Sequence, residues 1–241
     1  MASSKIIVGG LVPFTTIDYP GKVAMVVFLQ GCPWRCVYCS NPHLFEARQA
    51  AEQDIENWQY VLDMLSRRTK VIDAVVFSGG EATMQSKEVA NAIADIHFIS
   101  PDFKIGLHTN GCLPDAVEDL LPLVDWVGLD IKAPARLYED ITCVPGSAEA
   151  AFRSLDLLLK SCLPFEVRTT ADPRVLDKEA ILELASLLSR LGVRNYAVQR
   201  YRPVDKNADG VPSSADIMQF FTDTEFEAKL RAMFEKLTLR W

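Results

Sequence analysis

Six short, almost continuously hydrophobic runs recur along the chain and alternate with stretches of helical periodicity. We expect these runs to form parallel strands of a sheet buried on both faces, because such strands lack the polar alternation of a half-exposed sheet. The runs lie at 22–29, 71–77, 103–109, 124–131, 164–170 and 195–201.

Between the runs, apolar side chains return every three or four positions, a spacing that predicts amphipathic helices. Shorter patterns of the same kind follow Gly111 and end the chain. The predicted helical faces hold Ile55, Trp58, Val61, Leu62 and Leu65; Val89, Ile93 and Ile96; Phe152, Leu155 and Leu159; Ile181, Leu184, Leu187, Leu188 and Leu191; and Phe226, Leu230, Met233 and Phe234.

Six strand–helix repeats predict an α/β fold: an incomplete, TIM-like (βα)6 barrel with a mostly parallel, curved sheet and right-handed crossovers. The sequence contains no internal repeat, low-complexity tract or linker-like stretch. We therefore expect residues 1–241 to form a single domain, in which a C-terminal loop and helix (203–241) close the barrel.

Composition and charge narrow the class of protein. The 241 residues are 49% hydrophobic and 24% charged, which is typical of a globular domain with a large core. The net charge of −7, without any basic run, argues against nucleic-acid binding. No signal-peptide pattern opens the chain, and the longest apolar run, 23–29, is too short to span a membrane. We expect a cytoplasmic protein whose thiols stay reduced.

The unusual residues of the chain fall directly after the first four predicted strands. "QGCPWRCVYC" (30–39) follows the first strand and "SGGE" (78–81) the second, while "TNG" (109–111) and "DIK" (130–132) end the next two. In folds of this class the loops at the carboxyl ends of the strands gather at one face and carry the site. The sequence therefore predicts one site built from all four loops.

Three cysteines, Cys32, Cys36 and Cys39, have the spacing C-x3-C-x2-C. Three thiolates can hold three irons of a 4Fe-4S cluster and leave the fourth iron open to a small molecule. The alternative is zinc, because His43 could complete a Cys3His structural site, although such sites usually pair ligands from two separated turns. The remaining cysteines are scattered and are expected to be small apolar fillers: Cys112, Cys143 and Cys162.

These motifs resemble those of a known family. The cysteine loop, with Tyr38 before its third cysteine, resembles the signature of the radical S-adenosylmethionine enzymes, and "FSGGEATMQ" (77–85) resembles their Gly-Gly-Glu motif. More narrowly, "TTIDYPGKVAMVVFLQGCPWRCVYCSNPHL", "LHTNG" and "VGLDIKAP" are similar to the activating enzymes of glycyl-radical proteins, above all those that activate anaerobic ribonucleoside-triphosphate reductase.

The resemblance implies a role for each matching residue. Cys32, Cys36 and Cys39 would ligate the cluster, and the methionine end of S-adenosylmethionine would chelate the open iron. The amino group of this cofactor would be received by Gly79, Gly80 and Glu81, with the glycines allowing close approach of the backbone. The other implied cofactor contacts are Tyr38 beside the adenine, Asn41, Thr109 and Asn110 at polar atoms, Asp130 and Lys132 at the ribose or carboxylate, and Arg168 and Gln199 at the carboxylate.

The resemblance also implies a mechanism and partners. An electron from the reduced cluster would enter the sulfonium and break a carbon–sulfur bond, giving methionine and a 5'-deoxyadenosyl radical. That radical would take a hydrogen atom from a glycine α-carbon on a glycyl-radical enzyme, with a flavodoxin- or ferredoxin-type protein as electron donor. Two alternatives stay open: a radical S-adenosylmethionine enzyme acting on a small molecule or RNA base, and a non-catalytic, zinc-stabilised binding module.

Taken singly, the motifs also have purely structural interpretations. Gly79 and Gly80 could make a tight turn after a buried strand, and 109–111 is a good turn sequence. Asp130 and Lys132 could form a structural ion pair, and Arg168 could be a surface charge.

Two positions depart from the family pattern. Ser40 stands where many glycyl-radical activating enzymes have histidine, and His108 stands where they often have aspartate. Because an imidazole is a poor substitute for a carboxylate in binding a monovalent cation, we do not expect that cation here. We expect His108 to be a hydrogen-bonding residue behind the cofactor contacts.

The segment "DKNADGVPSSAD" (205–216) copies the opening of a calcium-binding EF-hand loop at Asp205, Asn207, Asp209 and Gly210. Its last position is Asp216 rather than glutamate, and a predicted strand precedes it. We therefore expect a polar surface loop.

Overall fold

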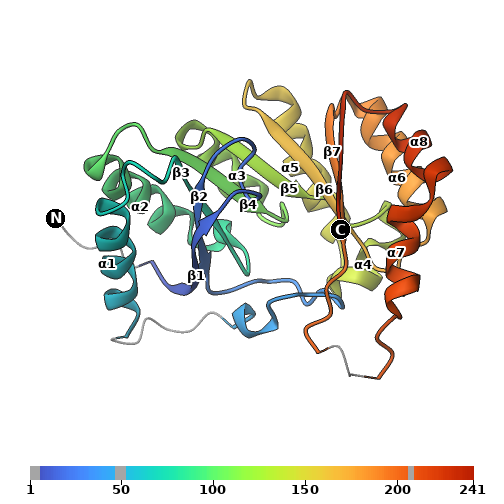
Figure 1. Ribbon diagram of the computed structural model, residues 1–241, viewed down its shortest axis with the longest axis horizontal. Helices are drawn as coiled ribbons and strands as arrows, with labels where there is room; N and C mark the ends of the chain where they lie inside the picture. The colour runs from blue at the N-terminus through green and yellow to red at the C-terminus, as the bar shows by residue number, and fades with distance from the viewer. Residues whose placement is uncertain (1–5, 47–52, 206–208) are drawn as a thin grey trace.

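The computed structural model describes residues 6–46, 53–205 and 209–241, with only the backbone of 53–57. Eight strands form one curved sheet in chain order, and helices cover its convex face (Figure 1). The strands are β1 (Val8–Thr15), β2 (Ala24–Leu29), β3 (Ala74–Gly79), β4 (Lys104–Thr109), β5 (Trp126–Asp130), β6 (Phe165–Ala171), β7 (Asn195–Arg200) and β8 (Lys236–Arg240).

Helices connect the successive parallel strands. They are α1 (Gln53–Ser66), α2 (Ser86–Ile99), α3 (Pro114–Leu120), α4 (Ala135–Thr142), α5 (Ser147–Lys160), α6 (Lys178–Leu191), α7 (Ser214–Thr222) and α8 (Thr224–Arg231), with short 3-10 turns at η1 (Pro42–Leu44), η2 (Ala82–Gln85) and η3 (Leu121–Leu123). Within the described ranges, every helix is too short or too polar to cross a bilayer.

The predicted α/β fold with a mostly parallel sheet is confirmed. Strands β2 to β8 run parallel, and only β1 is antiparallel to its neighbour β2. The sheet runs from β1 at one edge to β8 at the other, and in the part of the chain that the structure describes these two edges do not pair. The molecule is therefore a partial barrel that is open along one side.

The six predicted strands correspond to β2–β7, whereas β1 and β8 were not predicted. Both lie at the edges of the sheet, so neither needs a continuous apolar run. β1 contains Pro13, which a central strand would exclude. β8 alternates polar and apolar residues and follows a stretch with helical periodicity.

Most predicted helical faces are buried as expected. Trp58, Val61 and Leu65 of α1 are buried against the sheet, but the side chain of Ile55 lies outside the described residues. Leu191, assigned to the buried face of α6, is instead 45% exposed because it lies in the last turn.

The C-terminal segment differs from the expected loop and single helix. It holds two helices, α7 and α8, and then β8 extends the sheet without closing it. The segment 205–216 is also only partly a loop, because α7 begins at Ser214. The carboxylate of Asp216 accepts the backbone N–H and the hydroxyl of Ser213 in a capping box, whereas Asn207 of the EF-hand pattern lies outside the described residues.

The concave face of the sheet positions the site. At its N-terminal end this face is filled by an apolar cluster that includes Tyr19, Val26, Val76 and Trp126. Toward the carboxyl ends of β3–β7 the same face becomes polar. The functional side chains therefore lie directly above the packed apolar cluster.

Candidate functional site

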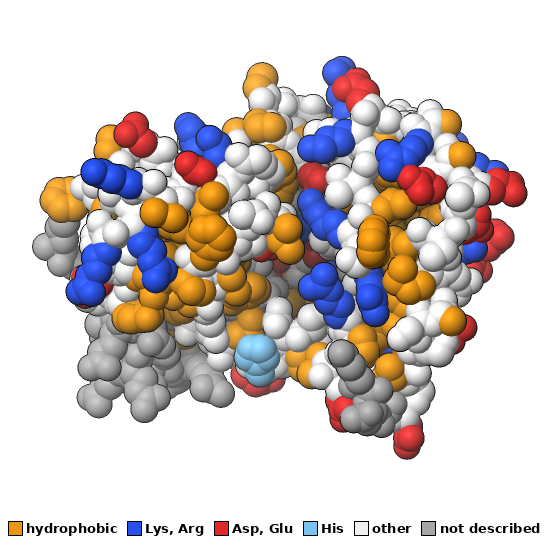
Figure 2. Space-filling view, viewed as in Figure 1, with side chains coloured by type: hydrophobic (Ala, Val, Ile, Leu, Met, Phe, Trp, Pro, Cys, Tyr) orange, Lys and Arg blue, Asp and Glu red, His pale blue; other side chains and the backbone are white. Residues whose placement is uncertain are grey.

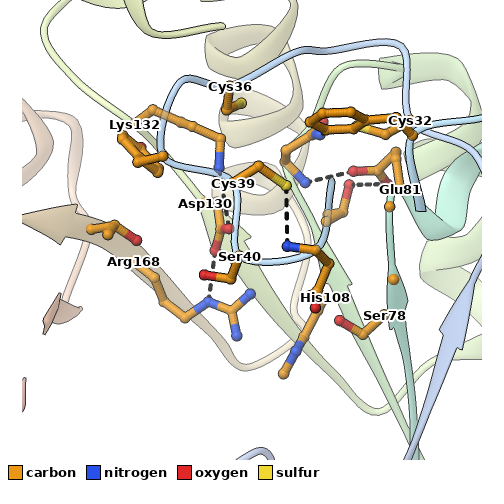
Figure 3. Close-up of a pocket in the computed structure, with 18 of the residues that line it drawn as sticks. Cys32, Cys36, Cys39, Ser40, Ser78, Glu81, His108, Asp130, Lys132 and Arg168 are labelled. Atoms are coloured by element: carbon orange, nitrogen blue, oxygen red, sulfur yellow. Dashed lines mark hydrogen bonds and ion pairs between the residues drawn. The ribbon is translucent and has the colours of Figure 1, made fainter. Parts of the chain in front are cut away.

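One cavity of about 230 Å³ lies at the carboxyl ends of β3–β7 and is lined by every residue that the sequence singled out for cofactor binding (Figure 3). These residues come from six separate segments, so only the fold brings them together. They are Cys32, Cys36, Tyr38, Cys39, Asn41, Gly79, Gly80, Glu81, Thr109, Asn110, Asp130, Lys132, Arg168 and Gln199. We call this space the cofactor cavity.

The cysteine loop follows β2 and is held at both of its sides. At its base, the backbone N–H groups of Gly31 and Cys32 donate to the carbonyls of Leu44 and Phe45, over 2.9 and 3.1 Å. At its tip, the Val37 N–H donates to a carbonyl at the end of α4 over 3.0 Å. The loop therefore presents its thiols from a fixed frame.

The surroundings of the thiols suit an iron–sulfur cluster. The backbone N–H of Asn41 lies 3.4 Å from the Cys39 sulfur, and the side-chain amide of Asn110 lies 3.7 Å from the Cys32 sulfur. N–H groups directed at cysteine sulfurs tune the potential of such clusters. Burial raises the pKa of the Cys32 thiol to about 12 and also raises that of Cys36, so a metal is needed to hold these sulfurs as thiolates.

The geometry does not support the alternative zinc site. His43, its fourth ligand, is exposed in η1 and does not line the cofactor cavity. Among the described residues, no group of three or more His, Cys, Asp or Glu side chains is close enough to hold a single metal ion. Three thiols that share a cavity without converging on one point fit three separate irons better.

Gly79 and Gly80 are required for packing inside the protein. A Cβ on Gly79, whose φ is 129°, would overlap the backbone of Leu29, and one on Gly80 would overlap the carbonyl of Gly31. The Gly80 and Glu81 N–H groups donate to the Leu29 and Gly31 carbonyls over 2.9 and 2.7 Å. The sequence interpretation gave approach of the cofactor as the reason for these glycines. The structure shows that contact with the end of β2, for Gly79, and with the cysteine loop, for Gly80, already demands them.

Glu81 is 1% exposed and joins two loops of the site. Its carboxylate accepts the N–H and hydroxyl of Thr83 at 3.0 and 2.7 Å, the Thr109 hydroxyl at 2.7 Å and the Asn110 N–H at 2.7 Å. Burial raises the pKa of this carboxyl, and these hydrogen bonds oppose the shift. Glu81 therefore ties the loop after β3 to the loop after β4.

Thr109 and Asn110 are likewise engaged with the protein. Besides its bond to Glu81, the Thr109 oxygen accepts the Gly111 N–H at 3.0 Å, and the Asn110 side-chain oxygen accepts the Cys112 N–H at 2.9 Å. These bonds fix the turn and aim the Asn110 amide at Cys32.

Asp130, Lys132 and Arg168 form a charged group on the opposite wall, where both cations point toward the carboxylate (Figure 3). The Arg168 Nε lies 2.8 Å from one Asp130 oxygen and the Lys132 Nζ 3.4 Å from the other. Burial alone would raise the pKa of Asp130, but Arg168 and Lys132 outweigh it and lower the pKa to about 2. Burial likewise opposes the charge of Lys132, yet Asp130 raises its pKa well above the usual range. Arg168 is 7% exposed, so it is not a surface charge.

Tyr38 packs beside this group. Its ring lies 5.8 Å from the Lys132 Nζ in a cation–π arrangement. Its hydroxyl is buried and has no hydrogen-bond partner among the described residues. Buried hydroxyls are normally paired, so this one is available to a bound group.

His108 lies at the edge of the cofactor cavity, half-buried against Trp126 with ring centroids 5.6 Å apart. Its Nε2 is 2.9 Å from the Asp18 carbonyl; because a carbonyl only accepts, this nitrogen carries the proton. Burial, followed by the charge of Arg168, lowers the pKa of His108 well below its usual range. The imidazole is therefore neutral and makes the hydrogen bond that was expected of it.

The cavity also contains residues that sequence reasoning did not single out. Phe45, Ser78 and Thr170 line it. Ser78 lies within the Gly-Gly-Glu stretch, and Thr170 pairs with Gln199 across β6 and β7, so both could have been found from their places at strand ends. Phe45, at the far end of the cysteine loop, belongs to no motif that the sequence analysis identified.

Comparisons with known proteins agree with this geometry. A family model described as the Radical SAM superfamily matches residues 26–185. A Methanocaldococcus jannaschii protein with the provisional name glycyl-radical enzyme activating enzyme is 32% identical over 83% of this chain and 82% of its own. A pyruvate formate-lyase-activating enzyme of Clostridium pasteurianum is 30% identical over 73% of each chain.

Among solved structures, native anSMEcpe with bound AdoMet and a Kp18Cys peptide aligns with a TM-score of 0.64. The alignment covers 88% of this chain and 61% of that one, at 14% identity. At this identity the likeness concerns the fold alone.

Proposed function

The chain belongs to the radical S-adenosylmethionine superfamily, and from that premise we propose that it activates a glycyl-radical enzyme by taking a hydrogen atom from a glycine α-carbon of its partner. The main observation in support is that Cys32, Cys36 and Cys39 share one cavity with the Gly79–Glu81 motif at the open side of a partial barrel. The names of the relatives in M. jannaschii and C. pasteurianum support the same class of activity.

The cofactors are a 4Fe-4S cluster and S-adenosylmethionine, as in this family. When bound and reduced, they supply a 5'-deoxyadenosyl radical that can take hydrogen from an unactivated carbon. The buried thiols fit the cluster, and the unpartnered Tyr38 hydroxyl and the charged wall opposite fit a polar cofactor.

The residues of this chain hold and orient those groups. We propose that Lys132 and Arg168, kept charged beside Asp130, bind the cofactor carboxylate, and that Asp130 reaches its ribose. Tyr38 faces the adenine in this assignment. Asn41 and Gln199 contribute polar contacts at the rim and Asn110 contributes one from its buried place beside Cys32, while Glu81 and Thr109 keep the two loops in place.

Within this class we propose anaerobic ribonucleoside-triphosphate reductase as the partner and a flavodoxin- or ferredoxin-type protein as the electron donor. The support is the sequence similarity of the stretches 15–44, 107–111 and 127–134 to activators of that reductase. Because the C. pasteurianum relative is named as an activating enzyme of pyruvate formate-lyase, that enzyme is the second candidate partner to test.

The test is to incubate the anaerobically reconstituted enzyme with S-adenosylmethionine, reduced flavodoxin and each candidate partner, and to record electron paramagnetic resonance spectra. We expect a glycyl radical on the reductase, with about four irons and four sulfides per enzyme chain. Cys36→Ala should lose the cluster and all cofactor cleavage. Cys162→Ala, which removes an exposed cysteine outside the cavity, should keep both.

Two results would contradict the proposal. One is an iron-replete Cys36→Ala enzyme that still cleaves S-adenosylmethionine, because Cys36 would then not be a ligand. The other is turnover of a free metabolite without a radical on any glycyl-radical partner.

A further inference from the structure

Gly128 lies in the middle of β5, where a glycine weakens a strand unless something has to approach the backbone closely. Its φ is not among the positive values of the chain, so the backbone conformation does not require a glycine at this position. In the sheet it pairs with His108 of β4 and Glu166 of β6. The reason for a glycine therefore lies in the space next to its Cα.

The guanidinium of Arg168 fills that space. A Cβ on Gly128 would lie 2.8 Å from the Arg168 Nη1 and 2.9 Å from its Cζ, with Trp126 next at 3.0 Å. The Arg168 Nη2 donates to the Gly128 carbonyl over 3.3 Å, and its Nε donates to Asp130 over 2.8 Å. Figure 3 shows the side chain reaching across from β6 to Asp130. The guanidinium is therefore held over β5 by a backbone carbonyl and a carboxylate.

This placement leaves N–H groups of Arg168 for a ligand. A guanidinium has five N–H donors in a fixed fork. That of Arg168 makes no further hydrogen bond with the described residues, and Arg168 lines the cofactor cavity. Asp130 and Gly128 thus fix the direction in which the remaining donors point.

The nearest competing carboxylate on β6 is already occupied. Glu166 lies two residues before Arg168, on the same face of the strand. Its carboxylate pairs with Arg240 at 2.7 Å. The guanidinium of Arg168 is therefore left to Asp130.

Positive charge alone does not mark the place of a cofactor carboxylate. Lys and Arg side chains also gather over β7 and β8 on the face shown in Figure 2. Arg168 differs from a general basic surface because two acceptors and a strand without a side chain set its orientation. Binding of a carboxylate through two parallel hydrogen bonds depends on that orientation.

We propose that Gly128 is a positioning residue for cofactor binding, because the absence of a side chain lets the Arg168 guanidinium lie over β5 and face the carboxylate of S-adenosylmethionine. The inference rests on the proposed function, which assigns Arg168 to that carboxylate. Gly128 does not line the cofactor cavity, so it acts only through Arg168. A methyl group at this position displaces the guanidinium, which is the far end of a flexible side chain, rather than the backbone.

The test measures cofactor binding separately from turnover. The cluster-loaded enzyme is kept oxidised so that the cofactor is not cleaved, and equilibrium dialysis gives the dissociation constants of S-adenosylmethionine and of decarboxylated S-adenosylmethionine. We expect Gly128→Ala to weaken binding of S-adenosylmethionine about tenfold, the effect of one hydrogen bond to a charged group. Binding of the decarboxylated analogue should not change, because it lacks the group that Arg168 holds.

A double-mutant cycle separates positioning from a general effect on the sheet. In an Arg168→Ala background, Gly128→Ala should not weaken binding of S-adenosylmethionine further, because the side chain that the methyl group displaces is gone. Gly106→Ala in β4 is the matched control. Its Cβ would meet Val76 and Tyr19 of the apolar cluster at 3.0 and 3.1 Å, and Gly106 does not line the cofactor cavity. It should leave both dissociation constants unchanged.

Three results would overturn the positioning role: unchanged binding of S-adenosylmethionine by Gly128→Ala, equal weakening of both ligands, or a further loss in the Arg168→Ala background. Urea unfolding adds a fourth, because a Gly128→Ala protein clearly less stable than Gly106→Ala would show that the methyl group disturbs the sheet instead of the arginine.

Radical formation on the candidate partners is measured in parallel with the wild type. A glycyl radical together with any of these four results refutes the role of Gly128 alone. The expected binding pattern without a radical on any glycyl-radical partner refutes the proposed function and leaves the role of Gly128 intact.

Discussion

The carboxylate of Glu81 accepts four hydrogen bonds from other residues of the protein. A residue of a cofactor-binding motif can therefore also have a structural role. The sequence pattern indicated an acid that complements an ammonium group. The structure adds that Thr83, Thr109 and Asn110 already bind it. Any contact between Glu81 and the cofactor is therefore made from a fixed position, which is what preorganised binding requires.

His108 gives a prediction about pH. Its pKa is lowered well below the usual range in the folded protein, whereas in the unfolded chain it titrates near the reference value of about 6.5. Below about pH 6.5 the unfolded state therefore binds more protons, and stability falls as pH falls. We expect His108→Gln, which keeps an N–H for the Asp18 carbonyl, to lose about 1 kcal/mol less stability between pH 7.5 and 5.5 than the wild type.

The measurement is urea unfolding of the metal-free protein at the two pH values. His43→Gln serves as the control, because it removes an exposed histidine of η1 that lies outside the cofactor cavity. If wild type and His108→Gln lost the same free energy of unfolding, the half-buried imidazole would not be the source of the effect.

At the scale of elements, the strands that could be predicted best from the sequence are those buried on both faces of the sheet. β2, β3 and β5 are hydrophobic on both sides over most of their length, so their runs were continuous and visible. β8 was missed because its concave face is polar, with Thr238 and Arg240 alternating with Leu237 and Leu239. The site residues were found because they lie near the carboxyl end of a predicted strand or directly after it. The contacts among them depend on strand order and register, which no local pattern contains.

The Gly-Gly-Glu turn after β3 predicts a structural cost for enlarging Gly80. A Cβ there would overlap the Gly31 carbonyl, and backbone cannot move aside as a flexible side chain can. We expect Gly80→Ala to lower the free energy of unfolding of the metal-free protein by about 1–3 kcal/mol. Gly10→Ala in β1, where the nearest atom would be the Phe28 Cβ at 3.7 Å, should change it little. Unchanged stability of Gly80→Ala in urea unfolding, with only cofactor affinity lost, would restore the original interpretation of the motif.

At the scale of the whole molecule, an open barrel must hold its last strand without a neighbour on the far side. β8 pairs only with β7 among the described residues, and its concave face adds one further tie, from Arg240 across to Glu166 on β6. The Glu166 side chain is 4% and the Arg240 side chain 23% exposed. This pair joins the end of the chain to the interior of the sheet.

Because Glu166 is the more deeply buried partner, removing Arg240 should be worse than removing both charges. Arg240→Gln leaves a buried carboxylate without its cation, and we expect it to lose about 3 kcal/mol of stability. In Arg240→Gln with Glu166→Gln no buried charge is left unpaired, so the double variant should regain most of that loss. Urea unfolding of the wild type, both single variants and the double variant measures the coupling. Losses that simply add would mean that β8 is held by its pairing with β7 and by the packing of α8, and that the open edge of the barrel needs no ion pair to stay in place.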